Sequence, residues 1–178
     1  FSAYTTEGNN YFFRSPIFDV VDSTHINTDA LFDTGLGLTN TFNNDDGFVF
    51  SAFVKILAFS EKTADIFVIG NTVAITYYHD DDKLCLRQKV SADWVDLTCA
   101  PNFRPGNFGK WINLSYTYDK NAVDNVNNVK FYVNYAYFPG TIPSKIVYDI
   151  LDNNDHELIV SKNFIGLVSE IRLGFGAI

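Results

Sequence analysis

Carboxylates gathered in short polar turns are the residues of this sequence best suited to hold a cation. Calcium takes about six to eight oxygen ligands from carboxylates, Asn side chains and backbone carbonyls, and acidic turns supply these groups. We therefore predict a calcium site among the carboxylate and amide side chains of two segments, which are Asp80, Asp81 and Asp82, together with Asp119, Asn121 and Asp124. Neither segment has the spacing of an EF-hand loop. The alternative is that these turns are solvated and only keep the chain soluble.

Aromatic side chains near the first acidic turn form a second candidate site. Trp94 is expected near the tip of a hairpin, and Tyr77, Tyr78 and His79 directly precede the turn. Together they are predicted to form a shallow ligand-binding surface, because aromatic side chains combine a large apolar face with a polar edge. The alternative is that Trp94 packs against the next strand.

The two cysteines lie in neighbouring strand-like segments joined by a short polar break. A hairpin centred on Ala92 places Cys85 opposite Cys99, with the Cβ atoms of such facing residues about 4.5–5.5 Å apart. That separation permits a disulfide after small adjustment, so we predict a cross-strand disulfide rather than two free thiols. A disulfide implies a secretory compartment. A zinc site would need more ligands than two cysteines supply.

One Asn-x-Ser sequon is present, at Asn113-Leu114-Ser115. Alternation places Asn113 on the opposite face of its strand from Ile112, Leu114 and Tyr116. If those three residues face the core, Asn113 is accessible and glycosylation fits a secreted chain. Short sequons also arise by chance.

The elements that position these residues are strands. Alternating apolar residues dominate, helical periodicity is nearly absent, and turn residues (Asn, Asp, Gly, Pro) separate the apolar segments, which is typical of an all-β sandwich or barrel. The predicted strands cover residues 47–59, 65–70, 72–78, 84–90, 94–98, 111–118, 129–138 and 166–175. Residues 144–151 fit either a short helix or an edge strand. Residues 47–59 are apolar on both faces, which indicates a strand deep in a two-layer sandwich.

The length, charge and composition of the chain exclude several classes of protein. The chain has 178 residues and a net charge of −8, so we predict a single domain, residues 1–178, without the basic surface that nucleic acids require. No apolar run reaches the ~18 residues of a membrane helix, and no membrane insertion is expected. Because the chain begins at Phe1 and contains no Met, we expect it to be a piece of a larger secreted protein.

Three strand motifs in the C-terminal half resemble those of a known family. They are a Gly109-Lys110-Trp111 strand ending at Asp119, a Phe131-Tyr132-Val133-Asn134 strand, and a terminal strand from Phe164 to Leu173. In this order they resemble laminin-G-like domains, over about residues 30–175. The resemblance implies a concanavalin-like (laminin-G-like) antiparallel β-sandwich jelly roll, which often holds calcium at its rim. At Asn134-Tyr135 relatives commonly turn on a Gly, so a longer strand or a different loop is expected there.

The resemblance also bears on catalysis and on Trp111. Glucan-cleaving enzymes of this fold carry Glu-x-Asp-x-x-Glu on one strand, and the four glutamates here (Glu7, Glu61, Glu157 and Glu170) do not form that pattern. Relatives often have a structural acidic residue at the position of Glu170. Trp111 is expected in the core, where the family keeps a structural Trp, although stacking on a sugar ring is the alternative. We therefore predict that the chain is not an enzyme.

The combined reading is a non-catalytic extracellular module that recognises a glycan or a protein. Two alternatives remain: a structural domain of an extracellular coat or filament, which would self-associate, and a divergent glycoside hydrolase.

Overall fold

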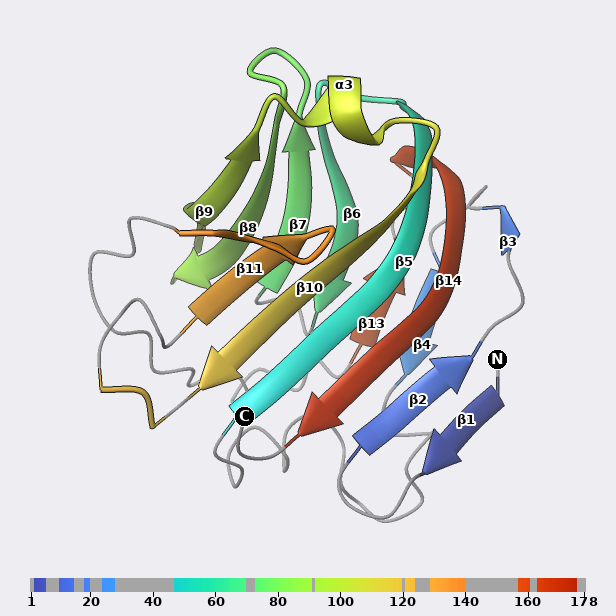
Figure 1. Cartoon of the computed structure of the whole chain (residues 1–178), viewed down its shortest axis with the longest axis vertical. Coiled ribbons are helices and arrows are strands. Elements are labelled where there is room, and N and C mark those ends of the chain that lie inside the picture. The colour runs from blue at the N-terminus through green and yellow to red at the C-terminus, as the bar shows by residue number, and fades with distance from the viewer. Residues whose placement is uncertain are drawn as a thin grey trace.

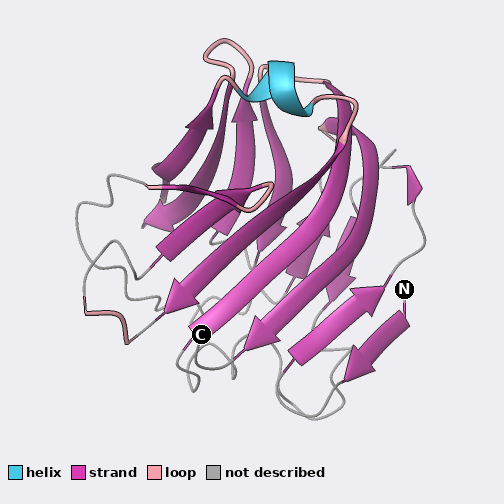
Figure 2. Ribbon diagram, viewed as in Figure 1, coloured by secondary structure: helices cyan, strands magenta, loops and turns pink. Residues whose placement is uncertain are grey.

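The computed structural model describes residues 2–5, 10–14, 18–19, 24–27, 47–69, 73–90, 92–119, 121–123, 129–139, 157–160 and 163–175. Within these residues the strands form two antiparallel sheets that face one another (Figure 1). Figure 2 shows how strongly strands dominate both layers. The predicted antiparallel β-sandwich jelly roll is confirmed. Residues 144–151, with their undecided secondary structure, lie outside the described residues.

The larger sheet has eight described strands in the spatial order β1-β2-β14-β5-β10-β11-β12, with β3 beside β14. Their bounds are β1 (Ser2–Thr5), β2 (Asn10–Arg14), β3 (Phe18–Asp19), β5 (Gly47–Phe59), β10 (Trp111–Asp119), β11 (Val129–Val133), β12 (Ala136–Phe138) and β14 (Phe164–Phe175). The C-terminal strand β14 lies between β2 and β5, so segments distant in sequence form the middle of this sheet.

The smaller sheet has six described strands in the order β4-β13-β6-β7-β8-β9. Their bounds are β4 (Thr24–Asn27), β6 (Thr63–Ile69), β7 (Val73–Tyr78), β8 (Lys83–Val90), β9 (Asp93–Pro101) and β13 (Glu157–Val160). The short helix α3 (Phe103–Asn107) connects this sheet to β10 and covers one end of the sandwich (Figure 1).

Alternation along β5 explains how the core forms. Phe50, Ala52, Val54 and Ile56 are fully buried against the smaller sheet, as expected when every second side chain of a strand points to one face. The intervening side chains lie on the outer face of the larger sheet, the side away from the smaller sheet. Leu57 there is 53% exposed. The predicted position of β5 deep in a two-layer sandwich is confirmed, but its outward apolar residues require another explanation.

Aromatic rings close the end of the core beneath α3. Tyr77 stacks on Phe59 with ring centroids 4.4 Å apart, and Phe103 and Phe108 pack around the same pair. Such ring pairs add to the free energy gained by burying their area. The cluster anchors the segment that leads into β10 and thereby fixes where Trp111 begins its strand.

The hairpin between β8 and β9 contains the predicted disulfide between Cys85 and Cys99, which face one another in the register. A register shift between Leu86 and Arg87 shows that the predicted symmetric hairpin is only locally correct. Arg87 faces Asp96 rather than Leu97. The pairing of the cysteines survives because the irregularity lies between them and the turn.

The turn between β11 and β12 consists of Asn134 and Tyr135, both with positive φ, at 49° and 64°. A two-residue hairpin turn of this kind matches the twist of antiparallel strands and favours Asn followed by Gly. The expectation of a longer strand or a different loop is wrong here, because Tyr135 occupies the position that glycine prefers.

None of the helices in the described residues has both the length and the hydrophobicity needed to cross a membrane.

Candidate binding face

The outer face of the larger sheet carries a row of aromatic and hydroxyl side chains across its central strands. Strand pairing places Trp111 beside Lys55, Asn113 beside Phe53, and Ser115 beside both Ser51 and Tyr132. Because paired residues of neighbouring strands share a face, these side chains all lie on the side away from the core. The pairing thus collects residues from β5, β10 and β11.

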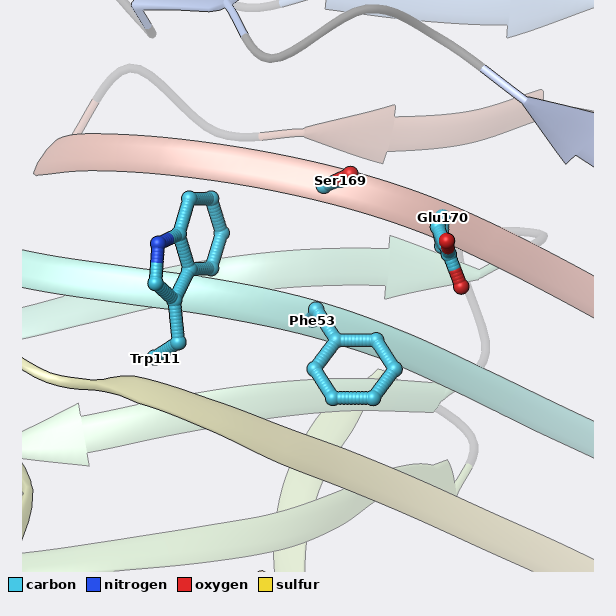
Figure 3. Close-up of a pocket in the computed structure, with 4 residues that line it drawn as sticks. All are labelled: Phe53, Trp111, Ser169 and Glu170. Atoms are coloured by element: carbon cyan, nitrogen blue, oxygen red, sulfur yellow. The ribbon is translucent and has the colours of Figure 1, made fainter.

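A shallow pocket of about 200 Å³ lies on this face, lined by Phe53, Trp111, Ser169 and Glu170. In Figure 3 the indole of Trp111 projects across β5 toward β14, where Ser169 and Glu170 lie, and Phe53 extends from β5 with its ring on the side away from β14. Trp111 is 40% exposed, so the prediction that it belongs to the core is wrong. We call this group the Trp111 pocket. It offers apolar ring faces next to a hydroxyl and a carboxylate.

A β-bulge in β14 presents Glu170 to the pocket. The register shifts between Ser169 and Arg172, so two residues of β14 stand where β5 contributes one. Glu170 has φ of 49°, and Ile171 beside it is buried in the core. Bulges re-aim side chains in this way. As a result Glu170 and Arg172 share the outer face, with their side chains 2.7 Å apart as an ion pair.

Asn113 is a buried part of this face rather than an accessible glycosylation site. Its side chain is 3% exposed and donates to Ser51 Oγ at 2.9 Å, while Ser115 Oγ donates to its carbonyl oxygen. The backbone N–H of Asn113 donates to the Asn134 side chain. The predicted accessibility of Asn113 is wrong, because the β11–β12 turn and neighbouring side chains cover it. Asn113 and Ser115 of the sequon therefore have a structural role, because their hydrogen bonds connect β10 to Ser51 of β5.

The residues predicted to form an aromatic surface around Trp94 do not all lie on one surface. Tyr77 is fully buried and therefore cannot belong to a contact surface, whereas Tyr78 and Trp94 lie near Arg87, whose guanidinium is 5.5 Å and 5.7 Å from their ring centroids. Burial, and then the hydrogen bond to Asp96, raises the pKa of Tyr78. His79 is exposed beside Asp80. The ring faces of Tyr78 and Trp94 are thus partly occupied by side chains of the chain itself.

The acidic turn at Asp80–Asp82 uses its carboxylates in separate contacts. Asp80 pairs with Lys62 at 3.0 Å, and this contact lowers the pKa of Asp80. Asp81 pairs with Lys83 at 3.3 Å. The Asp82 carboxylate accepts hydrogen bonds from the Tyr77 hydroxyl and from the Arg104 backbone. The three carboxylates therefore point to different partners within the chain.

The second predicted calcium group lies elsewhere. Asp119 ends β10 and accepts a hydrogen bond from the Asn121 backbone, and Asp124 lies outside the described residues. The turn at Asp80–Asp82 lies at the end of the sandwich near α3, whereas β10 runs away from that end (Figure 1). The two groups cannot form one site. Calcium binding by either group alone stays a prediction.

Among the described residues, one cluster of potential metal-binding side chains is compact: Cys85, Asp96 and Cys99. The two sulfur atoms are joined in the disulfide, so they are not available as thiolate ligands.

Comparison with known proteins finds similarity in structure only. No family model matches the sequence, and no curated protein matches it. Trypanosoma rangeli sialidase in complex with the inhibitor DANA aligns with a TM-score of 0.56 at 14% identity, over 99% of this chain and 26% of the sialidase chain.

Two botulinum neurotoxin structures align over 75% of this chain and 33% of the toxin chain. Type C, whose cell entry depends on interaction with two ganglioside molecules, has a TM-score of 0.54 at 12% identity. The binding domain of type DC, in complex with SialylT, has a TM-score of 0.50 at 11% identity. The chain thus spans about a third of the toxin chain. These likenesses show a lectin-like jelly-roll fold, and membership of the laminin-G-like family stays a prediction.

Sequence reasoning missed the Trp111 pocket for an identifiable reason. The sequence placed Trp111 and Asn113 on one face of their strand, but that face was not known to meet Phe53 of β5 and Glu170 of β14. The available signal was the apolar character of both faces of β5. The inward positions of β5 already supply apolar residues to the core. An additional Phe at the outward position 53 therefore indicates that the outer face also contacts something apolar.

Proposed function

We propose that this chain is a non-catalytic carbohydrate-binding module whose glycan lies on the outer face of the larger sheet. The observation that carries the proposal is the half-exposed Trp111 indole beside Phe53, with the polar groups of Ser169 and Glu170 on the opposite wall. A sugar ring has an apolar face and a polar edge. An aromatic platform with a few convergent polar groups matches both.

The Trp111 pocket is a better candidate than the Trp94 surface. The indole of Trp111 projects over β5 into the pocket, whereas Trp94 and Tyr78 already contact Arg87. The lectin-like fold supports the assignment. So do the ganglioside-dependent toxin and the sialidase among the structural neighbours, although their likeness to this chain is one of fold.

Binding without hydrolysis is supported by the carboxylates around the pocket. Retaining glycosidases need two carboxyl groups about 5–5.5 Å apart, and inverting enzymes need a pair about 6.5–9.5 Å apart. In the part of the chain that the structure describes, the pocket is lined by one carboxylate, that of Glu170, which pairs with Arg172.

An extracellular location accords with this function. The Cys85–Cys99 disulfide is typical of chains that fold in an oxidising compartment. The expected partner is a glycan on a surface or in a matrix, and binding to a protein or to a second copy of the chain is the competing role.

A glycan-array comparison of three proteins tests the proposal. The wild type should retain at least one class of oligosaccharide, Trp111→Ala should lose that signal, and Trp94→Ala should keep it. The two variants are matched, because each removes one of the two tryptophans, one on each sheet. Loss of signal in Trp94→Ala alone would move the site to the smaller sheet. Silence of folded wild-type protein across the array would instead favour the protein-binding or structural role.

A further inference from the structure

The charged residues around the Trp111 pocket indicate which class of glycan the proposed site would bind. This inference rests on the proposed function. We propose that the glycan is acidic and that the Lys55 ammonium binds its carboxylate or sulfate while a sugar ring lies on Trp111. The chemistry common to both ligands is an anionic group attached to a pyranose.

Strand register places Lys55 beside the pocket, next to Trp111. Lys55 faces Trp111 across the β5–β10 pair and Leu167 across the β5–β14 pair. Phe53 lies two residues away on the same strand and therefore on the same face. Lys55 is partly buried, and a lysine in this setting can cover its aliphatic stem while its ammonium group reaches solvent or a ligand.

Among the residues that the structure describes, Lys55 also differs from most other cations in having no ion-pair or hydrogen-bond partner. Elsewhere in the described residues, Lys62 pairs with Asp80, Lys83 with Asp81 and Arg87 with Asp96. Within those same residues, Lys55 and Lys130 have neither an ion pair nor a hydrogen bond from their side chains, and both lie on the outer face of the larger sheet. An ammonium group without an ion pair among the described residues, next to an aromatic platform, is available to a ligand anion.

The net charge of the chain sharpens this inference. At −8 the chain as a whole repels anions. The carboxylate that lines the pocket, that of Glu170, is paired with Arg172 at 2.7 Å. The Glu170 carboxylate is therefore already paired, whereas Lys55 has no ion pair among the described residues. Neutral glycans would need no cation beside the pocket.

Lys130 supplies a matched control for Lys55. It faces Thr117 of β10, six residues beyond Trp111, which corresponds to roughly 20 Å along the strand. This distance exceeds the ~8 Å Debye length at physiological ionic strength. Lys55→Met and Lys130→Met therefore make the same change in net charge on the same face, but only the first removes a charge beside the pocket.

The experiment measures binding by calorimetry for wild type, Lys55→Met and Lys130→Met. The probes are a uronic-acid oligosaccharide, the same oligosaccharide after carboxyl reduction, and a sulfated neutral oligosaccharide. We expect the wild type to bind one or both acidic probes more tightly than the reduced probe. Lys55→Met should lose about tenfold to a hundredfold in affinity for the acidic probe, the range of a hydrogen bond to a charged group. Lys130→Met should stay within about twofold of the wild type, the scatter expected of a surface substitution.

The acidic arms identify the source of the anion, because preference for the uronic probe indicates a carboxylate and preference for the sulfated probe a sulfate. Affinity for the preferred probe should also fall as salt is raised. Equal binding of the reduced and acidic probes, or equal losses in the two lysine variants, would overturn the acidic-ligand proposal and leave the glycan site intact. Glycan binding that Trp111→Ala does not change would instead overturn the proposed site itself.

Discussion

Two residues on or beside the binding face, Tyr135 and Glu170, hold a backbone conformation that glycine prefers. Their φ angles are 64° and 49°, and the left-handed region costs a residue with a side chain about 1–2 kcal/mol. Tyr135 is 74% exposed, so burial of its ring does not offset that cost. Strained positions of this kind concentrate at functional sites. At the residue scale, both side chains are candidates for ligand contact.

Replacing Tyr135 by Gly should stabilise the protein by about 1 kcal/mol, because Asn-Gly suits a turn with two positive φ angles. Chemical denaturation of wild type and Tyr135→Gly measures the change. Tyr135→Ala is the control, since it shortens the side chain but keeps the unfavourable conformation. Equal stability of the Gly and Ala variants would show that backbone strain is not the cause.

Residue types and local patterns were the part that the sequence predicted well. The alternation of β5 and β10, the pairing of Cys85 with Cys99 and the partition of Asn113 from Ile112 were all readable from period-two patterns. Those patterns define two faces of a strand but do not say what lies on each face. Trp111 and Asn113 share the outer face, yet one is exposed and the other buried. The difference depends on the neighbouring β5 and on the β11–β12 turn.

At the scale of elements, Asp82 links the β7–β8 turn to α3. Its carboxylate accepts hydrogen bonds from the Tyr77 hydroxyl at 2.9 Å and the Arg104 N–H at 2.9 Å, while its backbone carbonyl accepts from the N–H of Phe103. The contact holds the start of α3 over the aromatic cluster. The sequence indicated an acidic turn here, but two of its partners, Phe103 and Arg104, come from a segment about 20 residues further along.

Asp82→Ala should therefore lower the free energy of unfolding by about 1–3 kcal/mol, since it leaves partly buried donors without their acceptor. Asp81→Ala is the matched control. Its side chain is 64% exposed and pairs only with Lys83 among the described contacts, so its effect should stay within about 0.5 kcal/mol. The two denaturation midpoints measure the difference, and similar values would contradict a structural role for Asp82.

Gly166 determines how closely β14 approaches β5. A Cβ added at Gly166 would lie 2.0 Å from the backbone oxygen of Lys55. Gly166→Ala must therefore separate the strands at the register shift beside the Trp111 pocket. We expect a loss of about 1–3 kcal/mol in stability, the usual cost of an overpacked core.

Thermal unfolding measures that loss, and Gly106→Ala is the control because nothing lies within 4 Å of its added Cβ. A Gly166→Ala protein as stable as the control would show that the close approach is not required.

On the scale of the whole molecule, buried tyrosines should limit stability in alkali. Burial chiefly raises the pKa of Tyr77 above its ordinary value of 10.0, and Asp82 raises it further while Arg104 opposes both. A folded pKa above the unfolded one favours the folded state fully below about pH 10. That contribution is lost as pH rises through the folded pKa.

We expect the melting temperature to stay level up to about pH 10 and to fall above it, together with the appearance of tyrosinate absorbance. In Tyr77→Phe the fall should be shallower, since one buried ionisable hydroxyl is gone. A fall of equal steepness in wild type and variant would assign the effect to other groups.

The sandwich could be predicted from the sequence, but the location of the candidate site could not. Strand alternation and turn residues are local signals, and they fix the fold class. The Trp111 pocket depends on β5, β10 and β14 being adjacent, and these strands lie more than 50 residues apart in sequence at each pairing. The acidic turns and Trp94 near a predicted hairpin tip were recognisable from local sequence, and for that reason the site was predicted there.

The most direct test of the central claim, that a glycan binds over Trp111, uses the two indole N–H signals in a ¹H–¹⁵N NMR spectrum. The chain has two tryptophans, and Trp94→Phe assigns which signal belongs to which residue. On titration with a glycan retained on the array, the Trp111 signal should shift progressively while the Trp94 signal stays in place. A shift of the Trp94 signal alone would contradict the account and place the ligand on the smaller sheet.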